Sequence, residues 1–166
     1  DARRHTADMI AEGAAIVDVG GESTRPGHVQ ISVQEEIDRV VPVIEMIKKN
    51  FDTPVSIDSY KSQVVEAALK AGADLVNDIW GLKYDRKVAD LIAQYKVPCC
   101  LMHNREKAEY DNFLENFCQD MRDSLAIAKE AVDFFSGNQF ENFSLSDIAA
   151  GAAGAFVASI VALVFL

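Results

Sequence analysis

A regular alternation of short apolar runs with amphipathic helical patterns is the feature that most constrains the fold of residues 1–135. A helical pattern covers the first twelve residues and ends at a glycine. Four apolar runs follow, each succeeded by a helical pattern, at residues 16–19, 55–58, 75–79 and 98–103. Apolar strands separated by helices are typical of a parallel sheet covered by helices. The chain is therefore predicted to form an α/β domain of about four βα units.

Polar side chains lie where the four runs end, at Asp18, Asp58, Asn77 and His103. A doubly wound sheet and a (β/α)8, or TIM, barrel both fit the alternation. Polar groups at the carboxyl ends of successive strands are what a barrel active site is built from. The alternative, that Asp and Asn cap the helices that follow, stays open at each position. A whole barrel takes eight strands and about 250 residues, and only four strands are predicted here, so a barrel would be a partial one.

Charge and cysteine content exclude several classes of function. The chain has 16 Lys and Arg against 26 Asp and Glu, a net charge of −10, so a nucleic-acid-binding role is not expected. Cys99, Cys100 and Cys118 have no spacing suited to zinc, and their odd number argues against a disulfide framework. We expect reduced thiols in a cytoplasmic protein.

The last 31 residues differ in character from the rest. Residues 148–166 are 19 consecutive positions without a charge, and seven of them are Ala. This length suits a membrane-spanning or membrane-inserted helix, while the Ala content suits a buried or aggregation-prone one. We therefore predict two parts, a partial barrel domain at 1–135 and an unrelated tail with an apolar, membrane-associated helix at 136–166.

The most unusual stretch is residues 20–27, Gly-Gly-Glu-Ser-Thr-Arg-Pro-Gly, which directly follows a predicted strand. Its glycines allow backbone N–H groups to face an anion. Arg25 adds a planar cation that binds phosphate oxygens through two hydrogen bonds, and Ser23 and Thr24 add hydroxyl donors. The stretch suits a loop that binds phosphate or pyrophosphate, although a plain surface loop has the same composition.

Asp58 and Asn77 form a second candidate site. A heterocycle with adjacent ring N–H, amino and carbonyl groups needs one partner that only accepts and one amide that both donates and accepts. These two side chains, at the ends of adjacent predicted strands, supply that set. Met102 would add either a polarisable contact to a flat ring or ordinary core filling.

Four segments resemble the motifs of the dihydropteroate synthase family, in the family's order, at residues 13–27, 55–61, 76–79 and 101–104. The resemblance implies a (β/α)8 barrel that joins 6-hydroxymethyl-7,8-dihydropterin pyrophosphate to p-aminobenzoate. The products would be dihydropteroate and pyrophosphate, in a reaction assisted by Mg²⁺.

Site residues follow from the resemblance position by position. Asp58 and Asn77 would hold the pterin, and Ile79 and Met102 would line its pocket. The catalytic residues would be Thr24 and Arg25, which with Ser23 belong to the loop that closes over pyrophosphate and p-aminobenzoate.

Several family motifs have no match in this sequence. The first strand, with the Asn that contacts Mg²⁺, would precede residue 1, so no metal ligand is assigned here. The later Asp-Pro-Gly strand, the Lys that contacts the pterin, the Arg-x-His motif and the helices of the family's homodimer have no match either. The chain opens without Met and is expected to be a fragment, inactive alone.

Two alternatives stay open. A methyltetrahydrofolate-dependent methyltransferase shares the barrel and the pterin pocket, but its methyl donor carries no pyrophosphate. A non-catalytic, membrane-associated remnant would keep only the apolar tail. The family location would be cytoplasmic, with membrane association through residues 148–166.

Overall fold

The computed structural model describes residues 2–25, 27–136, 149–150 and 161–164 of the chain. Helices and strands alternate through the first part. In chain order the elements are α1 (Ala2–Ala11), β1 (Val17–Gly20), α2 (Val33–Asn50), β2 (Val55–Asp58), α3 (Ser62–Lys70), β3 (Leu75–Asp78), α4 (Lys87–Tyr95), β4 (Cys99–Met102), α5 (Phe113–Ser136), β5 (Ala149–Ala150) and β6 (Val161–Val164).

The four predicted strands form one parallel sheet in the order β1-β2-β3-β4. Each strand connects to the next through a helix, as the alternation in the sequence predicted. The register aligns Gly20 with Asp58, Asp58 with Asn77, and Asn77 with Cys100. Residues from four elements that are distant in sequence therefore lie level with one another near the carboxyl edge of the sheet.

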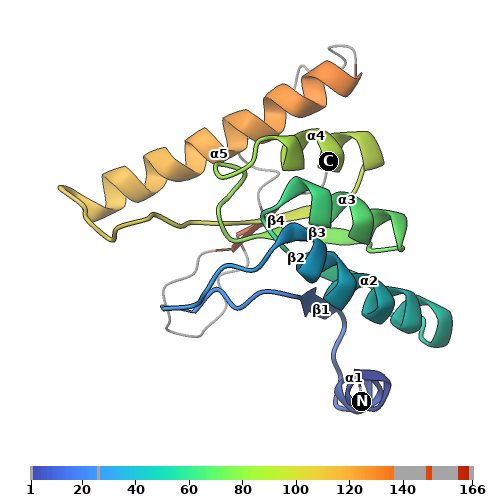
Figure 1. The fold of residues 1–166 in the computed structure, drawn as a ribbon. Coiled ribbons are helices and arrows are strands. Elements are labelled where there is room, and N and C mark those ends of the chain that lie inside the picture. The colour runs from blue at the N-terminus through green and yellow to red at the C-terminus, as the bar shows by residue number, and fades with distance from the viewer. Residues whose placement is uncertain (1, 26, 137–148, 151–160, 165–166) are drawn as a thin grey trace.

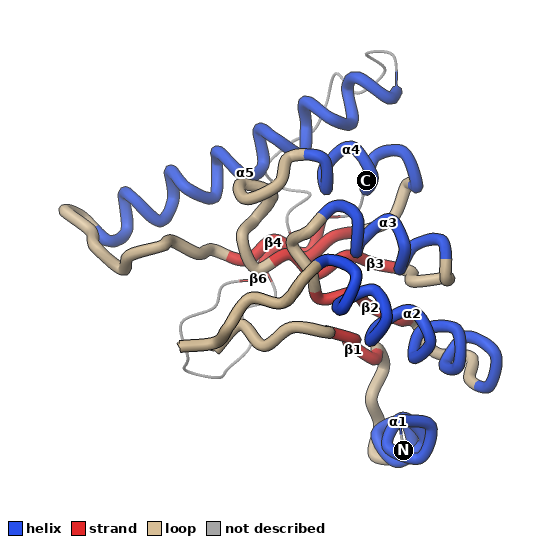
Figure 2. Tube along the Cα trace, viewed as in Figure 1, coloured by secondary structure: helices blue, strands red, loops and turns tan. Residues whose placement is uncertain are grey.

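The hydrophobic core lies between the sheet and the helices that cover one of its faces, α2, α3 and α4, with α5 packed against α4 (Figures 1 and 2). Alternate strand residues such as Val19, Ile57, Val76 and Leu101 are buried in this core. Because side chains alternate along a strand, Gly20, Asp58, Asn77 and Cys100 belong to the opposite face of the sheet. The candidate site residues are thus separated from the core by the sheet itself.

Capping groups fix where the helices begin. The Ser32 hydroxyl accepts a hydrogen bond from the Glu35 N–H at 3.2 Å, which is half of a capping box at the start of α2. The Glu35 side chain instead pairs with Arg39 one turn later. Asp85 accepts hydrogen bonds from the N–H groups of Ser62 and Lys87, at 3.0 and 3.1 Å, and thereby joins the N-termini of α3 and α4.

The tail differs from the expected apolar helix in the six residues that the structure describes. Residues 149–150 and 161–164 are strands, and β6 pairs antiparallel with β4. The N–H and C=O groups on the free side of β4 favour an added strand, and Val161 and Val164 have β-branched side chains that favour this state. The other residues of the predicted helix lie outside the described part. Among the helices that the structure describes, none has the length and apolar character needed to cross a membrane.

Candidate functional site

The candidate site is centred on Asp58 and Asn77, which β2 and β3 place directly beside one another. Both side chains are partly buried. Gly20 continues the row on one side of Asp58, and Cys100 continues it beyond Asn77. An added Cβ on Gly20 would lie 3.4 Å from Asp58 Oδ2, so the glycine leaves the carboxylate open on that side. The predicted pair is therefore brought together at one edge of the sheet.

The Asp58 carboxylate lies in an unfavourable electrostatic environment. Burial, followed by the charges of Asp18, Glu36 and Asp78, raises its pKa from 3.8 to about 6. Among the described residues, no group donates a hydrogen bond to it. A half-buried carboxylate kept without a donor is typical of a site that binds a ligand with N–H groups. Such a ligand would supply the missing donors.

The two polar atoms of the Asn77 amide differ in their hydrogen bonding. Its Nδ2 donates to Asp18 Oδ2 at 3.2 Å, which orients the side chain along the open face of the sheet. Its Oδ1 is buried and has no hydrogen-bond partner within the described part of the chain. A buried carbonyl oxygen without a donor costs free energy, so this atom is a candidate acceptor for a ligand N–H.

Ile79 and Met102 lie at the same edge of the sheet. Met102 ends β4, and Ile79 directly follows β3. Both are half-buried, so part of each side chain is left for other contacts. The pairing of Asp78 with Leu101 places Ile79 level with Met102. Their position agrees with the predicted lining of a pocket beside Asn77.

Ser23, Thr24 and Arg25 are exposed in the loop between β1 and α2. Figure 1 shows this loop extending past the carboxyl ends of the strands, on the same side of the sheet as the segment that joins β4 to α5. The Arg25 carbonyl accepts hydrogen bonds from the backbone N–H of His28 at 3.0 Å and from its ring Nδ1 at 2.9 Å. Gly27 lies between them with φ +83°, a backbone conformation that favours glycine.

Interpretation of the sequence missed a buried ion-pair network below this loop. The Lys61 ammonium lies 2.7 Å from Glu22 Oε2 and 2.8 Å from Glu36 Oε2. The three side chains are 7%, 3% and 1% exposed, respectively. Burial alone would raise the pKa of Glu22 and lower that of Lys61. The hydrogen bonds and charges of their partners outweigh burial, so the pKa of Glu22 is lowered and that of Lys61 is raised. The available signal was a Lys three residues after the end of the second predicted strand.

Asp78 and His103, which lie at the ends of β3 and β4, have hydrogen-bond partners within the fold. Asp78 is fully buried and accepts hydrogen bonds from the backbone N–H groups of Trp80 and Leu82, at 2.8 and 2.9 Å. Burial nevertheless raises its pKa. His103 bonds through Nε2 to Asp120 of α5 at 2.7 Å. Asp78 therefore organises the turn that follows β3 and does not cap the next helix, α4, which begins at Lys87.

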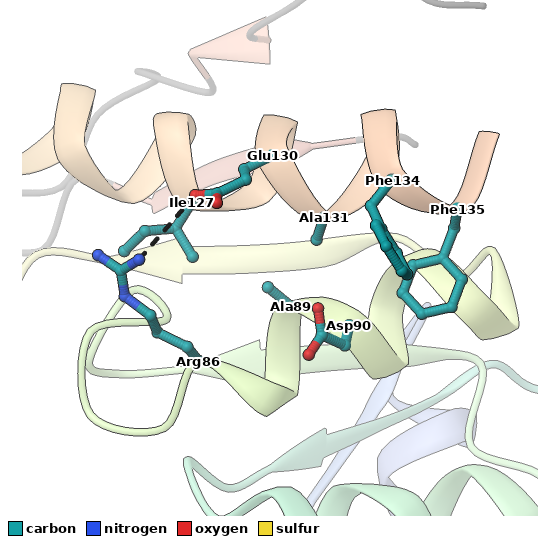
Figure 3. Close-up of a pocket in the computed structure, with 8 residues that line it drawn as sticks. All are labelled: Arg86, Ala89, Asp90, Ile127, Glu130, Ala131, Phe134 and Phe135. Atoms are coloured by element: carbon teal, nitrogen blue, oxygen red, sulfur yellow. Dashed lines mark ion pairs between the residues drawn. The ribbon is translucent and has the colours of Figure 1, made fainter. Parts of the chain in front are cut away.

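A cavity of about 400 Å³ lies between α4 and α5, away from these residues. Figure 3 shows Phe134 and Phe135 at one end of it and the Arg86–Glu130 ion pair, at 4.0 Å, at the other. It belongs to the helix layer, whereas Asp58 and Asn77 lie on the sheet face that points away from the helices. The cavity is therefore separate from the candidate site.

Comparison with known proteins identifies the family and the fold. A family described as "Pterin binding enzyme" matches residues 1–135. The chain belongs to the pterin-binding enzyme family. Within this family, the dihydropteroate synthase of Clostridium beijerinckii is 56% identical over 128 residues, which cover 77% of this chain and 48% of that protein. The dihydropteroate synthase of Bacillus subtilis is 49% identical over 127 residues, covering 76% and 45%.

Solved structures of the pterin-binding family have the same fold over the part that matches this chain. A dihydropteroate synthase from Clostridium difficile, crystallised in the presence of pteroic acid, superimposes with a TM-score of 0.75 at 43% identity, covering 77% of this chain and 49% of that one. The Xanthomonas albilineans dihydropteroate synthase with 4-aminobenzoic acid superimposes with a TM-score of 0.73 at 36% identity. The match covers 78% of this chain and 47% of that one. The chain thus spans about half the length of these relatives. The predicted partial barrel is confirmed.

Proposed function

We propose that the chain contains the pterin- and diphosphate-binding part of a dihydropteroate synthase. The whole protein would condense 6-hydroxymethyl-7,8-dihydropterin pyrophosphate with p-aminobenzoate to give dihydropteroate and pyrophosphate. The observation that carries the proposal is the in-register pairing of Asp58 with Asn77, on the sheet whose first strand leads into the loop that contains Arg25. The relatives support it, because those compared are named dihydropteroate synthases.

The two halves of the site suit the two halves of this substrate. An ionised Asp58 accepts hydrogen bonds from the amino group and ring N–H of a pterin, and Asn77 Oδ1 accepts another. A ligand without this pattern would leave both side chains unpaired, which gives the site its specificity. Ile79 and Met102 would contact the ring system.

The loop residues suit the diphosphate. Pyrophosphate gains negative charge as its bond to the pterin carbon breaks, and a guanidinium placed at the oxygens stabilises that charge. Arg25 would supply this cation, while Thr24 and Ser23 would donate hydrogen bonds. p-Aminobenzoate would then approach the carbon from which pyrophosphate departs, under the same loop.

Other properties of the family stay predictions for this protein: Mg²⁺ dependence, a homodimer and a cytoplasmic location. Within the described part of the chain, no three His, Cys, Asp or Glu side chains converge on a point that could hold a metal ion. None of these residues is therefore assigned to magnesium, and no step is derived through it.

Calorimetric titration of the chain tests the proposal. We expect 6-hydroxymethyl-7,8-dihydropterin pyrophosphate to bind more tightly than methyltetrahydrofolate. Asp58→Asn should weaken pterin binding by about 10- to 100-fold, the effect of losing a hydrogen-bonded charge. Asp52→Asn, at an exposed position before β2, is the matched control. Equal affinity of Asp58→Asn and the unchanged chain would contradict the role of Asp58, and preference for methyltetrahydrofolate would support the methyltransferase alternative.

A further inference from the structure

Glu22 connects the two ends of the loop that contains Arg25. Its Oε2 accepts hydrogen bonds from the Lys61 ammonium at 2.7 Å and from the Ile31 backbone N–H at 2.8 Å. Its Oε1 accepts from the Tyr60 hydroxyl. Glu22 lies near the start of the loop and Ile31 near its end, so one carboxylate closes the loop at its base.

Lys61 ties this base to the domain. Besides Glu22, its ammonium donates to the Ile31 carbonyl at 2.9 Å and lies 2.8 Å from Glu36 Oε2 of α2. The second oxygen of Glu36 accepts from the Ser59 hydroxyl at 2.8 Å. One lysine thus joins the loop, helix α2 and the segment between β2 and α3.

Backbone packing at Gly21 fixes the loop base from a second direction. A Cβ added at Gly21 would lie 2.9 Å from Glu36 Cγ and 3.1 Å from the Glu36 carbonyl oxygen, so only glycine fits against α2. The Gly21 carbonyl accepts a hydrogen bond from Arg39 at 2.8 Å. The loop base is thus held by Lys61 and by helix α2, whereas Ser23, Thr24 and Arg25 are exposed.

Stability alone does not explain such a network. A buried ion pair costs several kcal/mol of desolvation per charge, and apolar side chains of the same volume are often equally stabilising. What the charges add is a defined geometry, because both oxygens of Glu22 have fixed donors. A loop held in one position loses less conformational entropy when it binds a ligand.

We propose that Glu22 and Lys61 are positioning residues, which hold the loop so that Arg25 and Thr24 contact the diphosphate of the substrate. The proposal rests on the proposed function for the identity of that ligand. Neither residue touches the substrate. Their effect is on affinity for the diphosphate and not on recognition of the pterin ring, which Asp58 and Asn77 perform from the sheet.

The main test variant is Glu22→Ala, because it leaves the Lys61–Glu36 pair intact and the buried charges balanced. Calorimetry compares its affinity for the dihydropterin pyrophosphate with its affinity for 6-hydroxymethyl-7,8-dihydropterin, which has no diphosphate. We expect a loss of about tenfold or more for the first ligand and less than about twofold for the second. Glu66→Ala removes a carboxylate from an exposed Lys–Glu pair on α3 and should change neither affinity.

Hydrogen exchange gives a second measurement that needs no ligand. The Ile31 amide donates to Glu22, so Glu22→Ala should speed its exchange while amides of the sheet keep theirs. In a double-mutant cycle, Lys61→Met should add little to Glu22→Ala in the loss of diphosphate affinity. If Lys61→Met alone fails to fold, the Glu22 variant still decides the matter.

An equal loss for both ligands would overturn the proposal, because it would show a general structural effect. Unchanged diphosphate affinity would overturn it as well. If the unchanged chain binds neither ligand, the proposed function fails. The Ile31 exchange then decides on its own whether Glu22 anchors the loop, and unchanged exchange would show that it does not.

Discussion

Asp58 and Asn77 lie level with each other on neighbouring parallel strands, and each has an oxygen left without a donor in the described structure. Asp18 of β1 accepts a hydrogen bond from the Asn77 amide and adds a second negative charge near Asp58. A sequence selected only for stability would not keep this arrangement, because both unpaired groups cost free energy. Binding of the proposed ligand, through its N–H donors, would recover this cost.

The first prediction concerns Asp58 and pH. Its pKa is raised from 3.8 to about 6, so between these values the folded chain binds a proton that the unfolded chain releases. The ionised form therefore opposes folding, with a cost that grows through this window and is complete above it. Asp58→Asn should raise the free energy of unfolding at pH 7 by about 1 kcal/mol, after solvent screening is allowed for.

Urea denaturation at pH 4 and pH 7 measures this difference. The gain from Asp58→Asn should shrink towards zero at pH 4, where the folded chain already has a neutral Asp58. A gain that does not change with pH would show that charge is not its cause. The raised pKa of Asp58 also predicts that pterin affinity falls as pH decreases below about 6, because a protonated Asp58 accepts fewer hydrogen bonds.

The second prediction concerns Asp78, which has a structural role. Asp78→Ala would leave the buried N–H groups of Trp80 and Leu82 without acceptors. The chain should lose about 2–4 kcal/mol of stability, measured by urea denaturation. Asp90→Ala, at an exposed position in the first turn of α4, is the control and should cost far less. Equal costs would contradict the role of Asp78 in this turn.

The third prediction contrasts two adjacent glycines. Gly21→Ala should lower the melting temperature, because its Cβ would overlap Glu36; overpacking of this kind costs about 1–3 kcal/mol. Gly20→Ala places its Cβ in ordinary contact with Asp58, at 3.4 Å, so stability should change little. Pterin affinity should fall instead, since the methyl group covers one side of the carboxylate. If Gly20→Ala lowered stability and Gly21→Ala lowered only pterin affinity, the result would contradict the orientation of the two glycines, with Gly20 beside Asp58 and Gly21 against α2.

The fourth prediction concerns thiol reactivity. Burial, with added negative charge from Asp78, raises the pKa of Cys99 to about 12, and burial beside Asp18 and Asp58 raises that of Cys100 to about 11. Cys118 is exposed on α5. Iodoacetamide at pH 8 should therefore modify Cys118 alone in the folded chain and all three cysteines after denaturation. Fast labelling of Cys100 would show that the open face of the sheet is more accessible than described.

The strands, helices and principal site residues could be predicted from the sequence because their signals are local. The period of apolar residues marks each βα unit, and Ser32 marks the start of α2. The motif around Arg25 and the polar ends of β2 and β3 predicted a candidate site before any contact was known. These features depend on residues within a few positions of one another.

The ion pairs, the open face and the added strand were decided by the tertiary structure. Glu22 and Lys61 are 39 positions apart, and no local pattern indicates that a loop carboxylate meets a lysine at the start of another helix. Pairing of β6 with β4 depends on a sheet edge that exists only after the four strands assemble. Local periodicity determines what a segment becomes, but register and burial determine which charges meet, because both arise from packing between distant parts of the chain.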